Sequence, residues 1–226
     1  MTGKKNTLRL RIVDCGLTDF RRILDLQHQL QQKRHDNAVP NTILIVEHKP
    51  VITLGARENA NRLLLTPQQL HNKGIDLVGI RRGGGTTAHN PGQIVFYPIF
   101  NLHSVADGVT SYIRQLESVG SELLIRLGLD THPKKGFPGL WVDGRKIASI
   151  GVRVSKGITQ HGMAININND LSIFDHIIPC GLDGVVMTSL HNETGVLHDM
   201  KKVKRILAEI LVKHFSSEEF AEYENI

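Results

Sequence analysis

The spacing of apolar residues divides the first half of the chain into short strand-like segments and longer helical ones. Short apolar or alternating runs predict strands at 8–13, 42–47, 51–54, 75–80 and 93–100. Apolar residues recur at helical spacing over 18–33 and 109–127. A shorter helix is expected between Thr66 and Pro67, which favour a helix start, and Gly74, which favours a helix end.

The second half of the chain is richer in strand-like segments. Segments 140–142 and 146–154 flank Asp143 and Gly144, a pair typical of a type I′ hairpin because both central residues of that turn need positive φ. Residues 157–167 can pair next, and 200–215 carries the apolar stripe of a closing helix. This order predicts an α/β (α+β) fold, a mixed β-sheet packed with helices, forming a single domain over residues 1–226.

A polar, glycine-rich stretch, RRGGGTTAHNPGQIVFYP, runs from Arg81 to Pro98. Its glycines let the backbone approach a ligand closely, and its Thr, His and Gln side chains can form hydrogen bonds there. A phosphate loop is disfavoured, because phosphate-binding glycine loops open a helix, whereas this stretch leads into a strand. We therefore expect it to clamp an uncharged or carbonyl-bearing ligand; the alternative is a plain connection with strained turns.

Composition limits the class of protein. The chain has 226 residues, of which 40% are hydrophobic and 22% charged, as in an ordinary globular protein. No apolar run approaches the roughly 18 residues of a membrane span. The basic start, Met1 to Arg11, lacks the apolar core of a signal peptide. We therefore expect a cytoplasmic protein without a membrane partner.

The net charge of +5 could favour an acidic partner or reflect a solvated surface. Basic residues are spread along the chain, apart from a cluster at residues 201–205, and only 5% of residues are aromatic. Nucleic-acid modules combine tighter basic clusters with stacking aromatics. No nucleic-acid partner is therefore expected.

The two cysteines are interpreted separately. They lack C-x-x-C spacing, and the histidines form no H-E-x-x-H pattern, so no metal site is predicted. Cys15 ends a strand and is expected to be a buried, inert thiol. Cys180 lies between Pro179 and Gly181 on a tight turn, where a thiol can act as a nucleophile if a base or cation lies near it; a buried inert thiol is the alternative.

Lys146 is the main candidate for that base or cation. It follows the predicted hairpin turn, and strand alternation places it on the same side as the apolar Ala148, Ile150 and Val152. A desolvated lysine has a lowered pKa and can take a proton from a thiol, or as ammonium can stabilise the thiolate. The alternative is a lysine that extends to water. The other candidates are histidines, for which hydrogen-bonding or packing roles are expected.

Four sequence blocks together closely resemble the lipoyl(octanoyl) transferase family. They are RGGGTTAHNPGQIVFYP, GRKIASIG, HGMAIN and IPCGL, in the family's order and spacing, and the resemblance extends from about Glu47 to Leu190. It implies a fold similar to the catalytic domain of the biotin and lipoate protein ligases. It also implies transfer of an octanoyl group from octanoyl-acyl carrier protein to a lysine of a lipoyl domain, without ATP or another cofactor. The implied acceptors are the lipoyl domains of 2-oxoacid dehydrogenase complexes and the glycine cleavage H protein.

The resemblance also implies roles for individual residues. Cys180 matches the family's acyl-thioester nucleophile and Lys146 the residue that lowers its pKa. The implied substrate-binding residues are Arg82, Gly83, Gly84, Gly85, Thr86, Thr87, Ala88, His89, Ser149, Ile150, Gly151, Gly162, Met163 and Ala164. Ala88 and Asn90 depart from the pattern, since an aromatic residue and a glycine are common at these positions, and this leaves the acyl chain-length preference open.

These observations lead to one hypothesis and two alternatives. Cys180 would attack an octanoyl thioester, Lys146 would move the proton, and the acyl tail would lie against residues such as Val95, Tyr97 and Ile150. Backbone N–H groups near the glycine-rich stretch or Gly162 would receive the oxyanion. An ATP-dependent lipoate or biotin protein ligase would share the implied fold but would not need a reactive cysteine. A non-catalytic acyl-protein binding module would tolerate loss of Lys146.

Overall fold

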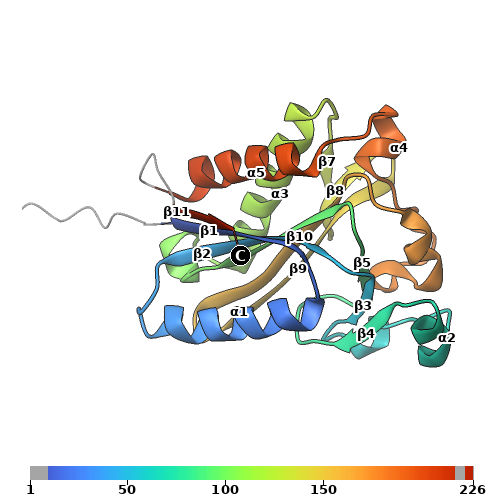
Figure 1. Ribbon diagram of the computed structural model, residues 1–226, viewed down its shortest axis with the longest axis horizontal. Helices are drawn as coiled ribbons and strands as arrows, with labels where there is room; N and C mark the ends of the chain where they lie inside the picture. The colour runs from blue at the N-terminus through green and yellow to red at the C-terminus, as the bar shows by residue number, and fades with distance from the viewer. Residues whose placement is uncertain (1–9, 217–221, 226) are drawn as a thin grey trace, which may run out of the picture.

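The computed structural model describes residues 10–216 and 222–225. Within them, the largest feature is an eight-stranded mixed sheet (Figure 1). In spatial order its strands are β11 (Glu222–Asn225), β1 (Leu10–Thr18), β2 (Asn41–His48), β6 (Gln93–Ile99), β10 (Ile158–Asn166), β9 (Arg145–Ser155), β8 (Phe137–Val142) and β7 (His132–Lys134). Strands β11, β1 and β2 run parallel, and the remaining neighbours are antiparallel. The predicted mixed sheet with packed helices is confirmed.

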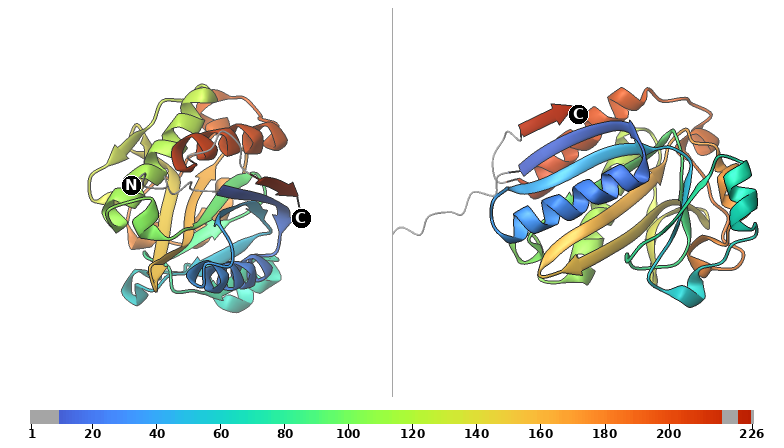
Figure 2. Two further views of the ribbon diagram at one scale, coloured as in Figure 1. Left: turned by 90° about the vertical axis from the view of Figure 1, so that its left-hand side faces the viewer. Right: turned by 60° about the horizontal axis from the view of Figure 1, so that its bottom comes forward.

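Helices cover both faces of this sheet. Helix α1 (Phe20–His35) lies along one face, and α3 (Val109–Arg126) and α5 (Met200–Phe215) lie over the other (Figures 1 and 2). In β2, Ile43 and Ile45 belong to the core shared with α3 and α5, whereas Leu44 and Val46 belong to the core shared with α1. Because both faces are buried, the central strands read as continuous apolar runs.

A second, three-stranded sheet lies beside the large one. It contains β4 (Asp76–Gly79), β3 (Val51–Leu54) and β5 (Thr87–His89) and is accompanied by the short helix α2 (Pro67–Asn72). The predicted start of α2 is confirmed, since Thr66 and Gln69 form a reciprocal capping box. The small sheet has its own apolar core, which includes Ile52, Leu70 and Phe174.

Several predicted boundaries hold and others shift. The hairpin between β8 and β9 has positive φ at Asp143 and Gly144, as predicted, and the long helix and the closing helix lie where expected. The first two residues of the strand predicted at 8–13 lie outside the described residues, and the observed strand β1 runs from Leu10 to Thr18. Helix α1 therefore starts at Phe20, where the Asp19 carboxylate accepts hydrogen bonds from two backbone N–H groups of the first turn.

The glycine-rich stretch differs from the predicted single loop that leads into one strand. Residues Thr87–His89 form β5 in the small sheet, the chain turns at residues 90–92, and β6 then crosses the large sheet. The prediction was wrong here because three residues carry too little hydrophobic periodicity to indicate a strand. The stretch consequently joins the two sheets, and this junction is where the pocket described below lies.

Among the α-helices and strands, three further elements had no clear sequence signal. The short helix α4 (Leu190–Thr194) and the edge strands β7 and β11 were not predicted. Among the described residues, no helix combines the length and apolar character needed to cross a membrane.

Candidate active site

A pocket lies where the small sheet adjoins β6, β9 and β10 of the large sheet. The pocket is narrow: its accessible volume is about 30 Å³, and part of it is open to solvent. Its lining is largely apolar and comes from segments far apart in sequence: Phe20, Ile80, Arg82, Gly84, Thr87, His89, Val95, Tyr97, Ser149, Ile150, Gly151, His161, Gly162, Met163, Ala164 and Cys180.

Cys180 lies in a single 3-10 turn, Pro179–Gly181, with its side chain half-buried at the pocket. Its backbone has φ of 57°, an uncommon value for a residue with a side chain. The Cys180 N–H donates to the Thr86 carbonyl at 2.8 Å. The Thr86 hydroxyl in turn accepts a hydrogen bond from the backbone N–H of Arg62 at 2.9 Å. The glycine-rich stretch therefore holds the thiol in place through its backbone.

Lys146 lies near the start of β9 and points its ammonium group at this thiol. Its Nζ donates to Cys180 Sγ at 3.9 Å, and only 2% of the residue is exposed. Its backbone is fixed to the segment after Cys180, since its N–H donates to Val186 O and its carbonyl accepts from Thr188 N. Burial lowers the pKa of Lys146 below its usual range, and the neighbouring Cys180 opposes this effect. The expected desolvation of Lys146 is confirmed.

Two residues that the sequence did not indicate also face Lys146. The Trp141 indole lies 5.2 Å from Lys146 Nζ, within the range of a cation–π contact. Glu117, on α3, accepts a hydrogen bond from Gly139 N at 3.0 Å and raises the pKa of Lys146 as a nearby negative charge. Neither has a motif of its own, because each meets Lys146 only through packing of β8 and α3 against β9.

Arg82 is a buried cation at the same pocket. Only 6% of it is exposed. Its Nη2 donates to the hydroxyl and the carbonyl of Thr53 at 2.8 and 3.2 Å, and its Nη1 donates to Gly83 O at 3.1 Å. Burial lowers the pKa of Arg82, although a guanidinium stays charged. Within residues 10–216 and 222–225, no atom accepts a hydrogen bond from the buried Nε.

Buried histidines surround the pocket as neutral rings. His89 Nδ1 contacts Gln93 Oε1 at 2.6 Å, and His48 Nε2 contacts the Tyr97 hydroxyl at 2.8 Å. Burial lowers the pKa of His48 to about 4 and the pKa values of His89 and His161 to about 3. The expected hydrogen-bonding and packing roles of His89 and His161 are confirmed by these contacts and by the edge-to-face contact of the His161 ring with Tyr97.

Most residues predicted to bind substrate lie at the pocket, and four do not. The exceptions are Gly83, Gly85, Thr86 and Ala88. Gly83 donates its N–H to Val152 O, and Gly85 packs closely against Ala60. Thr86 holds Cys180, as described above. The Ala88 side chain lies in the core of the small sheet.

Two glycines of the pocket lie too close to other atoms to accept a side chain. A Cβ on Gly162 would lie 2.2 Å from Phe96 O, and a Cβ on Gly151 would lie 2.8 Å from Arg82 Cδ. Asn90, one of the two departures from the family pattern, fixes the turn before β6. Its Nδ2 donates to Asp170 O at 2.8 Å, and its Oδ1 accepts from Asn169 Nδ2.

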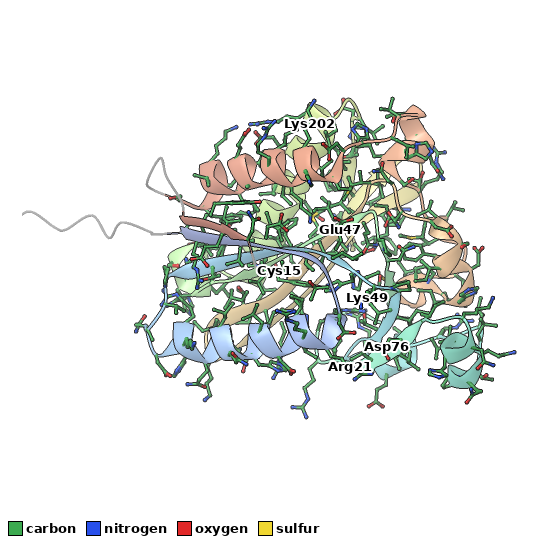
Figure 3. All side chains as sticks on the ribbon, in the orientation of Figure 1. Cys15, Arg21, Glu47, Lys49, Asp76 and Lys202 are labelled. Carbon is green, nitrogen blue, oxygen red and sulfur yellow. The ribbon has the colours of Figure 1, made fainter. Side chains whose placement is uncertain are left out.

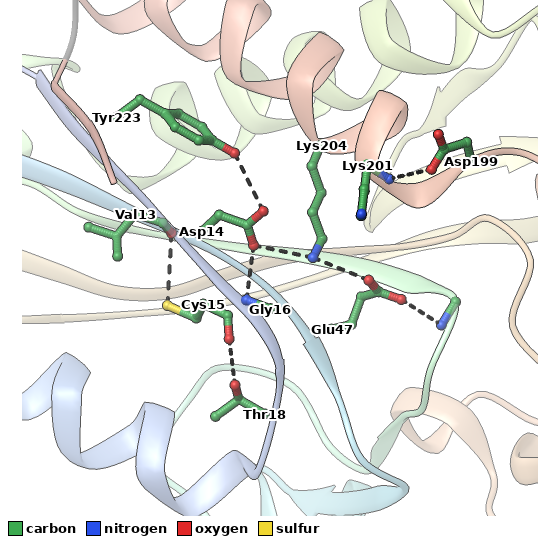
Figure 4. A network of polar contacts seen from close by, with 11 residues as sticks. Val13, Asp14, Cys15, Gly16, Thr18, Glu47, Asp199, Lys201, Lys204 and Tyr223 are labelled. Carbon is green, nitrogen blue, oxygen red and sulfur yellow. Dashed lines mark hydrogen bonds and ion pairs between the residues drawn. The ribbon is translucent and has the colours of Figure 1, made fainter. Parts of the chain in front are cut away.

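Ion pairs fix the elements around the pocket. Arg21, at the start of α1, binds Asp76 of β4 at 3.1 Å and so connects α1 to the small sheet (Figure 3). The Lys204 ammonium lies 3.2 Å from both Asp14 and Glu47, and Glu47 also accepts from Gly92 N in the turn before β6 (Figure 4). Helix α5 is thereby connected to the glycine-rich stretch.

Cys15 lies in the same region as this ion-pair network and not at the pocket (Figure 4). It is 3% exposed, and burial raises its pKa to about 12. A thiol with that pKa is almost entirely protonated at neutral pH, which confirms the expected buried and inert character of Cys15.

Comparison with known proteins agrees with this geometry. Residues 19–212 match the lipoyl protein ligase A/B catalytic domain family. An octanoyltransferase from Desulfovibrio desulfuricans is 39% identical over 197 residues, which cover 87% of the chain and 83% of that relative. The mitochondrial octanoyltransferase LIP2 of Arabidopsis thaliana is 37% identical over 209 residues, covering 92% and 89% of the two chains.

Solved structures share the fold at much lower identity. Lipoate-protein ligase A bound with ATP superposes with a TM-score of 0.70 at 16% identity, covering 96% of the chain and 88% of that structure. The biotin protein ligase of Aquifex aeolicus gives 0.55 at 16% identity, covering 92% and 70%. The predicted similarity to the biotin and lipoate ligase fold is confirmed. Together with the sequence relatives, this shows that the chain belongs to the lipoyl protein ligase A/B catalytic domain family as an octanoyltransferase, an acyltransferase of protein lipoylation.

Proposed function

We propose that the chain carries out octanoyl transfer through a thioester on Cys180, with octanoyl-acyl carrier protein as donor and a lysine of a lipoyl domain as acceptor. The observation that carries this proposal is the pair of Lys146 Nζ and Cys180 Sγ, 3.9 Å apart beside an apolar pocket. A thiol nucleophile with a buried amine beside it is suited to exchange with a thioester donor.

In the first step the neutral amine of Lys146 takes the proton of the Cys180 thiol. Burial lowers the pKa of Lys146 and so makes its neutral amine easier to form. The thiolate then attacks the octanoyl carbonyl, a new thioester bond forms at Sγ, and the bond to the carrier sulfur breaks. The carrier thiolate leaves with the proton held by Lys146, so Lys146 is neutral again.

In the second step the acceptor lysine amine attacks the octanoyl thioester on Cys180. An amide bond forms, the bond to Sγ breaks, and the amine proton passes to Lys146. The Cys180 thiolate and the Lys146 ammonium then stand side by side, as they did after the first proton transfer. One residue therefore serves both steps, because each moves one proton at the same atom.

The pocket lining supports an acyl chain as the bound group. Val95, Tyr97 and Ile150, predicted to contact the acyl tail, all lie in its lining together with Phe20 and Met163. These surfaces are apolar, and an octanoyl chain would gain free energy by leaving water against them.

The structure narrows the choice of oxyanion donors. The backbone N–H groups of Cys180, Gly83 and Thr86 already donate to carbonyl oxygens. Within the glycine-rich stretch we therefore assign the oxyanion to the backbone N–H of Gly84. Gly84 lines the pocket and has positive φ, a conformation that glycine adopts without strain.

The partners follow from the family. We propose the lipoyl domains of 2-oxoacid dehydrogenase complexes and the glycine cleavage H protein as acceptors, and these must share a compartment with the carrier protein. We propose the cytoplasm as that compartment. The relative from Arabidopsis thaliana is named as mitochondrial. The net charge of +5 suits acidic partners of either kind.

Intact-mass spectrometry tests the intermediate directly. Incubation of the chain with octanoyl-acyl carrier protein should add one octanoyl group, and Cys180→Ala should show no adduct. Cys15→Ala is the matched control, because that thiol is buried away from the pocket, and it should acylate as the wild type does. Lys146→Met should slow acylation by roughly 100-fold or more, the usual contribution of a positioned acid–base group.

Two outcomes would contradict the proposal. Full transfer by Cys180→Ala to a lipoyl domain would exclude the thioester route. ATP-dependent attachment of free octanoate or lipoate by the same variant would point to the ligase reaction of the structural neighbours instead.

A further inference from the structure

Two buried cations, Arg82 and Lys146, approach the pocket that contains Cys180. Arg82 is 6% exposed and Lys146 is 2% exposed. Lys146 contacts the thiol directly, while Arg82 lines the same pocket as Cys180 and is held rigidly by Thr53 and Gly83. Burial of two positive charges near one thiol is costly unless a negative charge compensates them.

The described residues offer few candidates for that negative charge. Among them, Arg82 forms no ion pair with a carboxylate, and its hydrogen bonds go to uncharged oxygens. Tyr97 lies in the same lining, but burial raises its pKa far above neutral pH. His89 and His161 are neutral or positive, never negative. Cys180 is therefore the group of the pocket lining that can become an anion and compensate Arg82.

Lys146 has a different set of neighbours. Cys180 and Glu117 favour its charged form, Trp141 lies at cation–π distance, and burial disfavours the charge. Glu117 therefore compensates Lys146 in part, whereas the electrostatic neighbours that favour the Arg82 charge are Cys180 and Tyr97. Because Tyr97 stays neutral, the Cys180 thiolate is the anion of the pocket lining that compensates the charge of Arg82.

We propose that Arg82 is a positioning residue of acyl transfer, whose buried guanidinium stabilises the thiolate that Cys180 forms when Lys146 takes its proton. The proposal rests on the thioester mechanism above. It gives Arg82 a role in stabilising the thiolate, in addition to the substrate binding implied for the glycine-rich stretch. It also gives a reason for the unpartnered Arg82 Nε, which is a free donor at the pocket.

Acylation changes this balance of charge. When Cys180 becomes a thioester, its negative charge disappears and two buried cations remain. Lys146 can lose its proton, whereas a guanidinium cannot. The proton therefore passes from Lys146 to the departing carrier thiolate, and the acyl-enzyme is left with a neutral amine ready to accept the proton of the acceptor lysine. Arg82 thus favours the thiolate before acylation and the neutral Lys146 after it.

Alkylation of Cys180 by iodoacetamide as a function of pH tests the first part without any acyl donor. Arg82→Gln should move the pH of half-maximal alkylation upward by about one unit or more and slow the reaction near neutral pH about tenfold. Arg82→Lys, which keeps a positive charge, should restore much of the rate. Arg81→Gln is the matched control, since it removes the same charge from the exposed neighbouring position and should leave the profile unchanged. Labelling is located by mass, with Cys180→Ala as blank.

An unchanged alkylation profile in folded Arg82→Gln would overturn the proposal, as would an equal shift in Arg81→Gln. If Arg82→Gln does not fold, Lys146→Met serves in its place, because Arg82 is intact there. In Lys146→Met, Cys180 should still reach half-maximal alkylation at a lower pH than the thiol of glutathione. A pH of half-maximal alkylation equal to or above that of glutathione would refute a role for Arg82. Alkylation needs no octanoyl group, so the two experiments are independent. Absence of an octanoyl adduct in the intact-mass experiment would contradict the thioester mechanism, whereas the alkylation profile would still measure the effect of Arg82 on the thiol.

Discussion

Acid should destabilise this fold well before its carboxylates titrate, because three histidines are buried as neutral rings beside the pocket. His48, His89 and His161 are 0%, 6% and 3% exposed. Burial lowers their pKa values from 6.5 to about 4, about 3 and about 3. In the unfolded chain each ring meets water and takes up a proton near its ordinary pKa. Between the two pKa values the unfolded chain therefore binds more protons, and the stability of the folded chain falls as pH falls.

The magnitude follows from the number of protons. Three protons bound by the unfolded state alone correspond to roughly 4 kcal/mol of folding free energy per pH unit. Stability is complete above about pH 6.5 and should fall by roughly 6 kcal/mol by about pH 5, a large part of the roughly 5–15 kcal/mol of an ordinary domain. His89 also repels a charge on its neighbour His48, so protonation of one ring makes the next less favourable.

Urea denaturation followed by circular dichroism at several pH values between about 5 and 7.5 measures this slope. His161→Asn should reduce it by about one third, and asparagine suits the positive φ of 56° at that position. His103→Asn is the control, because that exposed side chain meets water in both states, so the slope should stay as in the wild type. If the pH dependence of the free energy of unfolding over this range corresponds to uptake of less than one proton on unfolding, the reasoning is refuted.

Two further substitutions test how the pocket is held together. Gly162→Ala places a Cβ 2.2 Å from Phe96 O, so strand β10 must move away from β6. The stability of the fold, measured by thermal unfolding, should fall by about 1–3 kcal/mol. The rate of octanoyl transfer should fall as well. Lys204→Met leaves two carboxylates facing each other without their cation, and we expect a loss of about 3 kcal/mol in urea unfolding. A change below about 0.5 kcal/mol in either variant would contradict the packing described above.

The sequence was sufficient for the elements whose signals are local. The capping box of α2 needs only Thr66 and Gln69, and the β8–β9 turn needs only Asp143 and Gly144. The stripe of α5 is set by the spacing of its own apolar residues. In each case the stabilising contacts lie within a few residues of one another, so the pattern is visible without knowledge of the fold.

The same reasoning failed where an element is defined by its neighbours. Strand β5 is three residues long and exists because it pairs with β3. Ala88 stood in the predicted acyl-binding segment, yet its side chain packs into the core of the small sheet. Glu117 faces Lys146 from α3, which packs against β8, and nothing in its local sequence indicates this.

The chain's chemistry was determined by the sequence to a large extent. Cys180 on a turn, Lys146 in an apolar strand and the glycine-rich stretch are recognisable from residue type and spacing, and their resemblance to a family named the reaction. What the tertiary structure alone decided is how these groups act on one another. It removes Lys146 from water, brings its Nζ to 3.9 Å from Sγ, and buries Arg82 at the same pocket, where its hydrogen bonds go to uncharged oxygens. Burial and through-space charge depend on segments far apart in sequence, so no local pattern encodes them.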